Sequence, residues 1–136
     1  MNKLQKIVLI MLLIPNLAMA ESYLCIGEAA GGVKFDEITG KALGTSFKTT
    51  DKYIIKKKYS EWQVNDFGGQ STFSYQCNAE GNFIHCDTKE LGRFIISTDR
   101  LRYINYSSTG WRGPMMIEGE KITTTPYIEV GSCSEI

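Results

Sequence analysis

Four cysteines are the residues whose type and spacing carry the clearest chemistry in this chain: Cys25, Cys77, Cys86 and Cys133. Zinc sites favour pairs of cysteines separated by roughly two to four residues, and no pair here has that spacing. An even number of cysteines in an exported chain indicates disulfides instead. We therefore expect two disulfides, no free thiol and no metal site.

One disulfide can be placed from the register of a hairpin. A two-residue turn at Gly81-Asn82, with glycine first as a type II′ turn requires, sets Cys77 opposite Cys86. Alternation along the two strands makes the cysteines a non-hydrogen-bonded pair, in which side chains lie close together. A disulfide across the strands is geometrically reasonable there.

The other two cysteines, Cys25 and Cys133, stand near the two ends of the predicted domain. Four cysteines allow three connectivities, and we rank Cys25–Cys133 first because the hairpin accounts for the other pair. This bond would join the first strand to the last. A closed or nearly closed meander barrel needs that connection, since it removes free sheet edges.

The remaining reactive residues indicate no catalytic site. His85 is the single histidine and lies beside Cys86 on the outward face of the hairpin, so we expect a solvent-facing side chain. The sequence has no nucleophile elbow, phosphate loop, dinucleotide fingerprint or calcium loop. No spacing favours a catalytic pair among the scattered acids, which include Asp66, Asp87, Asp99, Glu118 and Glu120. We predict that the protein is not an enzyme and needs no cofactor.

The best binding candidate is the segment 110–116, within the longest stretch that lacks a strand pattern, 107–126. Long loops in compact domains are usually functional or disordered. Tryptophan and arginine are enriched at interface hot spots, and methionine adapts to varied partners. We therefore expect Trp111, Arg112, Met115 and Met116 to contact a partner. The alternative is that Trp111 and the methionines pack under the loop as a small satellite core.

The elements that must position these residues are short strands. Residues alternate between apolar and polar in segments rich in β-branched and aromatic side chains, and turn residues separate these segments. The expected strands include 23–26, 31–35, 52–56, 61–65, 72–77, 100–106 and 127–130. The pattern predicts an all-β fold with about seven to nine antiparallel strands, and favours a meander β-barrel over a β-sandwich.

The first twenty residues have the three parts of a secretory signal peptide. Lys3 and Lys6 precede an apolar run over 7–14, and Ala18-Met19-Ala20 forms a cleavage site. We expect residues 1–20 to be removed and residues 21–136 to form one disulfide-stapled β domain. The apolar run is too short to span a membrane, and the residues before Cys25 do not match a lipoprotein site. We therefore expect a periplasmic or secreted protein without a lipid anchor.

The balance of basic and acidic residues argues against nucleic acid as a ligand of this domain. The chain holds 15 basic and 15 acidic residues, and the predicted leader removes two lysines, which leaves a slight negative balance. A chain with this balance has no overall attraction for nucleic acid or anionic lipid.

Two segments carry a resemblance to a known group of proteins. The first is Cys25-Ile26-Gly27-Glu28, and the second is the ending Pro126-Tyr127-Ile128-Glu129-Val130-Gly131-Ser132-Cys133-Ser134. Together they resemble an uncharacterised family of small exported proteins of Gram-negative bacteria and their mobile elements. The resemblance implies export and brings no activity or functional residues with it.

These observations give three hypotheses for function. The first is a non-catalytic binding protein whose partner is another envelope or extracellular protein, for example an inhibitor or immunity factor against an envelope-targeting enzyme. The second is a carrier that holds a small apolar ligand inside the barrel, because an eight-stranded barrel can be filled or can hold one ligand. The third, which the sequence favours least, is a small hydrolase.

Overall fold

The computed structural model describes residues 22–36, 38–68, 75–88, 92–109, 115–117, 120–122 and 125–136. Over these residues the protein contains strands and no helix. The predicted signal peptide lies outside the described residues. The strands are β1 (Ser22–Phe35), β2 (Ala42–Phe47), β3 (Lys52–Lys58), β4 (Glu61–Asp66), β5 (Tyr75–Glu80), β6 (Phe83–Thr88), β7 (Gly92–Ser97), β8 (Arg102–Ser107), β9 (Met115–Ile117), β10 (Glu120–Ile122) and β11 (Tyr127–Glu135).

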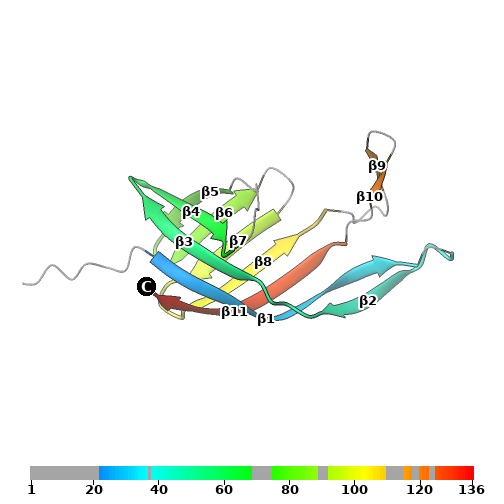
Figure 1. The fold of residues 1–136 in the computed structure, drawn as a ribbon, viewed down its shortest axis with the longest axis horizontal. Helices are drawn as coiled ribbons and strands as arrows, with labels where there is room; N and C mark the ends of the chain where they lie inside the picture. The colour runs from blue at the N-terminus through cyan, green and yellow to red at the C-terminus, as the bar shows by residue number, and fades with distance from the viewer. Residues whose placement is uncertain are drawn as a thin grey trace, which may run out of the picture.

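The main sheet is antiparallel and almost closes into a barrel (Figure 1). Its strands are hydrogen-bonded in the order β4-β3-β1-β11-β8-β7-β6-β5, and β2 pairs with β1 outside this path. The two end strands, β4 and β5, lie near each other but are not hydrogen-bonded neighbours over the described residues, so the barrel is nearly closed. Around the barrel, the strands β1, β3, β4, β5, β6, β7, β8 and β11 follow one another in chain order, and β11 is hydrogen-bonded to β1. The predicted meander barrel is therefore confirmed, and β9 and β10 form a separate two-stranded sheet.

Both predicted disulfides are present, and no cysteine is free. Cys25 on β1 lies opposite Cys133 on β11, and Cys77 on β5 lies opposite Cys86 on β6, with a Cα–Cα distance of 4.0 Å in each pair. The hairpin has the predicted register, and Gly81 has a φ of 57°, which a glycine adopts without strain.

The barrel interior is filled by alternate residues of its strands, as the pleat of a sheet requires. The largest fully buried side chains include Phe94, Ile55, Ile84 and Ile96. Burying each contributes about 1.5–3 kcal/mol relative to exposure. Gly131 on β11 makes room at the centre, because a Cβ there would collide with the Tyr103 ring and with the backbone of β1. The barrel therefore has a packed core.

An arm formed by β1 and β2 projects from the barrel (Figure 1). The sequence predicts two short strands here, and the structure instead has one strand of 14 residues, β1. The register of β1 against β11 shifts between Gly27 and Ala29, and such a bulge bends a strand. The first half of β1 pairs with β3, and the second half pairs with β2. The bulge therefore lies where the strand leaves the barrel wall.

Candidate functional site

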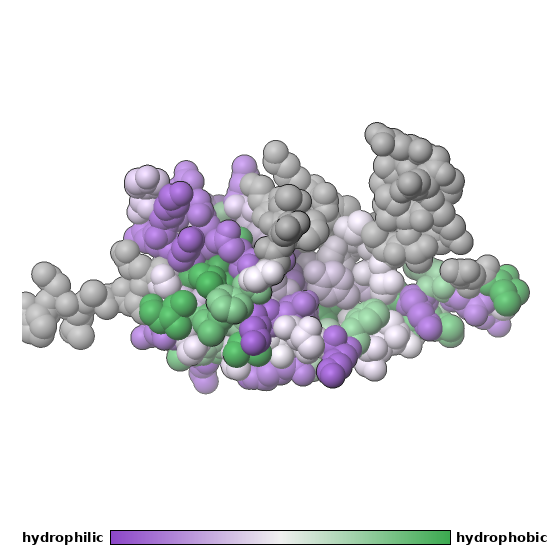
Figure 2. Space-filling view, in the orientation of Figure 1, coloured by the Kyte–Doolittle hydropathy of each residue, from purple (hydrophilic) through white to green (hydrophobic). Residues whose placement is uncertain are grey.

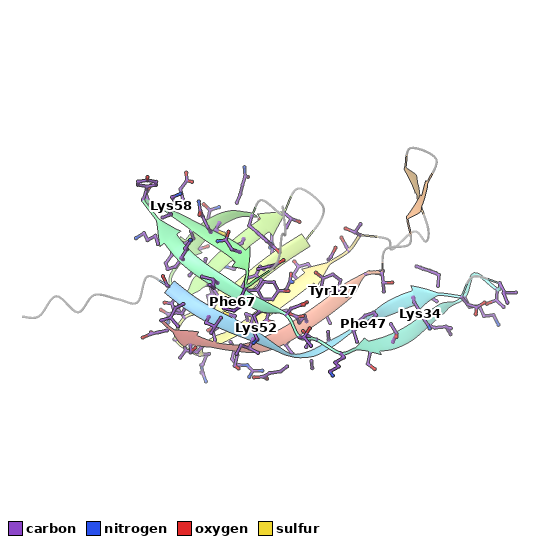
Figure 3. All side chains as sticks on the ribbon, viewed as in Figure 1. Lys34, Phe47, Lys52, Lys58, Phe67 and Tyr127 are labelled. Atoms are coloured by element: carbon purple, nitrogen blue, oxygen red, sulfur yellow. A yellow bond between two sulfur atoms is a disulfide. The ribbon has the colours of Figure 1, made fainter. Side chains whose placement is uncertain are left out.

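A pocket of about 350 Å³ lies where the arm meets the barrel, and we call it the junction pocket. Its walls come from β1, from β2 and the segment that follows it, and from the start of β11. The lining residues are Ala30, Phe47, Lys48, Thr49, Asp51, Thr125, Tyr127 and Glu129. Figure 3 labels Phe47 at the end of β2 and Tyr127 at the start of β11, both at this junction.

Glu129 is a buried carboxylate in this pocket, with 2% of its surface exposed. It points inward because it shares the face of β11 that carries Gly131 and Cys133. Thr49 Oγ1 donates a hydrogen bond of 2.6 Å to Glu129 Oε2, and the Tyr103 hydroxyl donates to Oε1. No lysine or arginine of the described residues forms an ion pair with Glu129. Burying a charge in this way is costly unless it is compensated.

A second group of hydrogen bonds links the pocket to the barrel interior. Asn105 is 4% exposed and lies opposite Glu129 across β8 and β11. Its Nδ2 donates to the Tyr53 hydroxyl at 3.1 Å and to the Tyr127 hydroxyl at 3.4 Å. The Tyr53 hydroxyl in turn lies 3.5 Å from Asp51 Oδ2. Two carboxylates, an amide and three tyrosine hydroxyls thus form one polar region beside the pocket.

The buried tyrosines act here as hydrogen-bonding groups. Burial raises the pKa of Tyr53 far above its usual range, and the nearby carboxylates of Glu129 and Asp51 raise that pKa further. Burial and the hydrogen bond to Glu129 have the same effect on the pKa of Tyr103. Burial also raises the pKa of Tyr127. These hydroxyls therefore keep their protons at neutral pH and can donate hydrogen bonds to carboxylates.

An aromatic cluster lies in the barrel interior, and Tyr103 links it to the junction pocket through its hydrogen bond to Glu129. The rings of Phe94 and Tyr103 stack with centroids 4.9 Å apart and planes within 10°. Tyr53 meets both rings edge-on, at 5.2 Å from Phe94 and 5.6 Å from Tyr103. Contacts of this kind add about 0.5–1.5 kcal/mol each beyond simple burial. The packed rings therefore hold the Tyr103 hydroxyl in place beside Glu129.

Two other pockets have weaker chemistry. A pocket of about 580 Å³ follows the seam between β4 and β5, with Glu61 as its only charged lining residue. A third, of about 300 Å³, contains Asp87 and Arg93, which form an ion pair with each other. Of these pockets, the junction pocket alone includes a buried carboxylate without an ion-pair partner among the described residues.

The predicted binding segment is only partly described. Trp111 and Arg112 lie outside the described residues, so their predicted role stays a prediction. Met115 and Met116 belong to β9, which pairs with β10, so the prediction that this stretch lacks strands is wrong. A three-residue strand is too short for a periodic pattern to reveal.

His85 was predicted to lie on the outward face of the hairpin. It lies on the outer side of the hairpin, half-buried beside the Phe83 ring, with the ring centroids 5.9 Å apart.

Sequence reasoning missed the junction pocket, although a signal for Glu129 was available. Residues two apart on a strand share a face, so Glu129 has the same parity as Cys133, which was predicted to lie in the core. A carboxylate at that parity points inward. Phe47 and Thr49 had no comparable signal, because the folding back of β2 onto β1 brings them to the site.

The described residues contain neither a metal-binding cluster nor a membrane-spanning helix. No three or more His, Cys, Asp or Glu side chains gather there in a way that could hold a metal ion. No helix in the same residues is long and apolar enough to cross a membrane. Comparison with known proteins finds no matching family model, curated protein or solved structure.

Proposed function

We propose that the protein is a non-catalytic binding protein that works in the periplasm or outside the cell. Its partner is another envelope or extracellular protein, which it contacts with the arm and the junction pocket. If that partner is an enzyme that attacks the envelope, the protein would act as its inhibitor or immunity factor. The two disulfides support this location, because such bonds persist in oxidising compartments.

The observation that carries the proposal is the apolar surface of the arm. Leu43 and Phe47 share one face of the arm and are 44% and 40% exposed, and Val33, on the other face, is 37% exposed. Figure 2 shows hydrophobic residues along the arm and at its tip, and among the described strands β2 pairs only with β1. Exposed apolar side chains gathered on a projecting element are typical of protein-binding surfaces. The arm is therefore suited to contact a partner, with the junction pocket at its base.

The polar groups of the pocket also suit binding. Thr49 and Tyr103 each direct a hydroxyl proton to Glu129, and Asn105 holds two further tyrosine hydroxyls. These hydrogen bonds keep the carboxylate in one position. A binding site benefits from such preorganisation, because less conformational entropy is lost on association.

A second candidate function is the transport of a small ligand, and the junction pocket favours it in a modified form. A volume of about 350 Å³ lies at the lower end of the range for small-molecule sites. The ligand would occupy this pocket, because the barrel interior is filled by Phe94 and its neighbours. The hypothesis of an apolar ligand deep inside the barrel is correspondingly less attractive.

Affinity capture from an envelope extract tests the proposed function. Phe47→Ala should abolish capture of a protein that the wild type retains. Phe83→Ala is a matched control, because Phe83 is 46% exposed and lies on β6, away from the arm. If the same proteins are captured by the wild type and by a Leu43→Ala, Phe47→Ala double variant, the proposal is wrong.

A further inference from the structure

We propose that the junction pocket binds the ammonium group of a lysine side chain presented by the partner protein. This inference rests on the proposed function and specifies the chemistry of its contact. It follows from three observations: an uncompensated buried carboxylate, aromatic walls at the pocket entrance, and the set of acceptors that remain available inside.

The charges of the pocket favour a cation. Asp51 and Glu129 supply two carboxylates, against one ammonium from Lys48. Lys48 is exposed and forms no ion pair among the described residues, so its flexible side chain can extend into water. Among the described residues, the hydrogen bonds to Glu129 come from the neutral hydroxyls of Thr49 and Tyr103. A cation entering the pocket would compensate the buried charge, which the protein's described residues leave without a counter-ion.

The walls of the pocket suit the stem of a lysine. Phe47 and Tyr127 are 40% and 36% exposed and line the pocket from the arm and from β11. Aromatic faces attract ammonium groups, and they also pack against the methylene groups that precede the charge. A short charged ligand without such a stem would leave these rings uncovered.

The acceptors favour ammonium over guanidinium. Each oxygen of Glu129 already accepts one hydrogen bond, from Thr49 or from Tyr103. A carboxylate has about four acceptor positions, so about one remains free on each oxygen. An ammonium has three donors that can point to separate acceptors, and Asp51 offers another in the same pocket.

A matched pair of probes tests the chemistry directly. The full mature protein, labelled with ¹⁵N, is titrated with N-acetyl-lysine methylamide and with N-acetyl-norleucine methylamide, which keeps an apolar stem and lacks the ammonium. The lysine probe should shift the amide resonances of Ala30, Asp51 and Glu129, and should bind at least about tenfold more tightly than the norleucine probe. Equal binding of the two probes, or no shift at these amides, overturns the inference. Tighter binding of N-acetyl-arginine methylamide also overturns the choice of lysine.

Two matched variants test whether the charge of Glu129 binds the probe locally or whether the overall negative charge of the protein attracts it. Glu129→Gln keeps the shape, removes the charge and replaces one acceptor oxygen by an NH2 donor, so it should weaken the lysine probe at least about tenfold. Glu61→Gln makes the same change in the seam pocket and should alter the affinity by less than about twofold. Equal losses in the two variants would contradict the inference. The spectrum of Glu129→Gln shows at the same time whether the fold is intact.

Partner capture distinguishes failure of this inference from failure of the proposed function. If Phe47→Ala abolishes capture and Glu129→Gln leaves it unchanged, the arm binds the partner and the lysine contact is wrong. If both variants abolish capture while Glu61→Gln does not, both proposals stand. If neither variant affects capture, both are wrong for this partner.

Discussion

The barrel interior has two parts that are built in the same way and hold opposite chemistry. In one, alternate strand positions carry aliphatic side chains, including Ile55, Ile84 and Ile96, which are at most 2% exposed. In the other, beside the junction pocket, the same kind of position carries Asn105 and Glu129, which are equally buried. The strands and their alternation therefore set which residues are buried, and residue type then decides whether burial stabilises the fold or prepares a site.

Tyr103 shows where the two parts meet. Its ring stacks on Phe94 and packs over Gly131, as an apolar core residue would. Its hydroxyl donates to Glu129, as part of the polar region. The apolar part should supply most of the free energy of unfolding, and the polar part should contribute little or oppose folding. Four experiments test this difference.

The largest effect is expected from the disulfide that joins the first and last strands. Replacing both Cys25 and Cys133 by alanine should lower the free energy of unfolding by about 5 kcal/mol, because the closed loop is long. The sequence separation is 108 for this pair and 9 for the other. Replacing Cys77 and Cys86 should therefore cost only about 2.5 kcal/mol. Urea unfolding measures both, and equal losses would show that loop length is not the controlling factor.

A large loss is also expected from a cavity in the apolar part. Ile96→Ala should lower the free energy of unfolding by about 3 kcal/mol, because Ile96 is fully buried and its neighbours can collapse only partly. Ile128→Ala is the control, since Ile128 is 48% exposed on β11, and its loss should stay below about 1 kcal/mol. Similar losses in the two variants would mean that the interior around Ile96 is poorly packed.

Alkaline pH should destabilise the protein through its buried tyrosines. The pKa values of Tyr53, Tyr75 and Tyr103 are raised mainly by burial from the ordinary value of 10.0. Above that pH the unfolded chain loses protons that the folded protein keeps, so the free energy of unfolding falls as pH rises. Each tyrosine contributes up to about 1.4 kcal/mol per pH unit.

The variant Tyr53→Phe should reduce this alkaline loss by one tyrosine's share. Denaturant unfolding of the wild type and the variant, at neutral pH and about one unit above pH 10, gives the comparison. Identical pH dependence in the two proteins would show that Tyr53 ionises equally well when folded.

The smallest effect on stability is expected at Glu129. Glu129→Gln removes a buried charge, and the amide can still bond to the hydroxyls of Thr49 and Tyr103. The free energy of unfolding should therefore change by less than about 1 kcal/mol, in the stabilising direction. Thermal unfolding at neutral pH checks this. A loss of about 3 kcal/mol or more would indicate that the carboxylate is paired with a cation inside the protein.

Much of the barrel follows from local sequence. The turn at Gly81 requires a positive φ, which sets the register of its hairpin and places Cys77 opposite Cys86. Because the four cysteines form two pairs, the remaining bond had to join Cys25 to Cys133. That bond connects the first strand to the last and so predicted a closed or nearly closed barrel. The hairpin was predictable because it depends on a short-range rule, and once its disulfide was placed, one pairing remained for the other two cysteines.

Other elements could not be predicted in this way. In β7, Ile95 and Ile96 are adjacent and face opposite sides, so the segment shows no clean alternation although Phe94 and Ile96 are core residues. The strand β2 has almost no buried position, and therefore no apolar pattern. The junction pocket is lined by residues from β2 and from β11. These strands meet near the bulge at Gly27, and no sequence pattern predicts that bulge.

The position of β11 between β1 and β8 has a consequence for the order of folding. Until residues 127–135 are in place, β1 and β8 each have an unpaired edge, and neither the Cys25–Cys133 bond nor the floor of the junction pocket exists. The strands β5 to β8 can pair one after another along the chain, and β1 can pair with β2 and β3. The edge of β1 that faces β11 stays open until a partner arrives that is 108 positions away at the disulfide. Such distant pairings slow folding and prolong the exposure of sheet edges that can aggregate. A chain held open at this stage would lack the junction pocket, so closure of the barrel and formation of the pocket coincide in one strand.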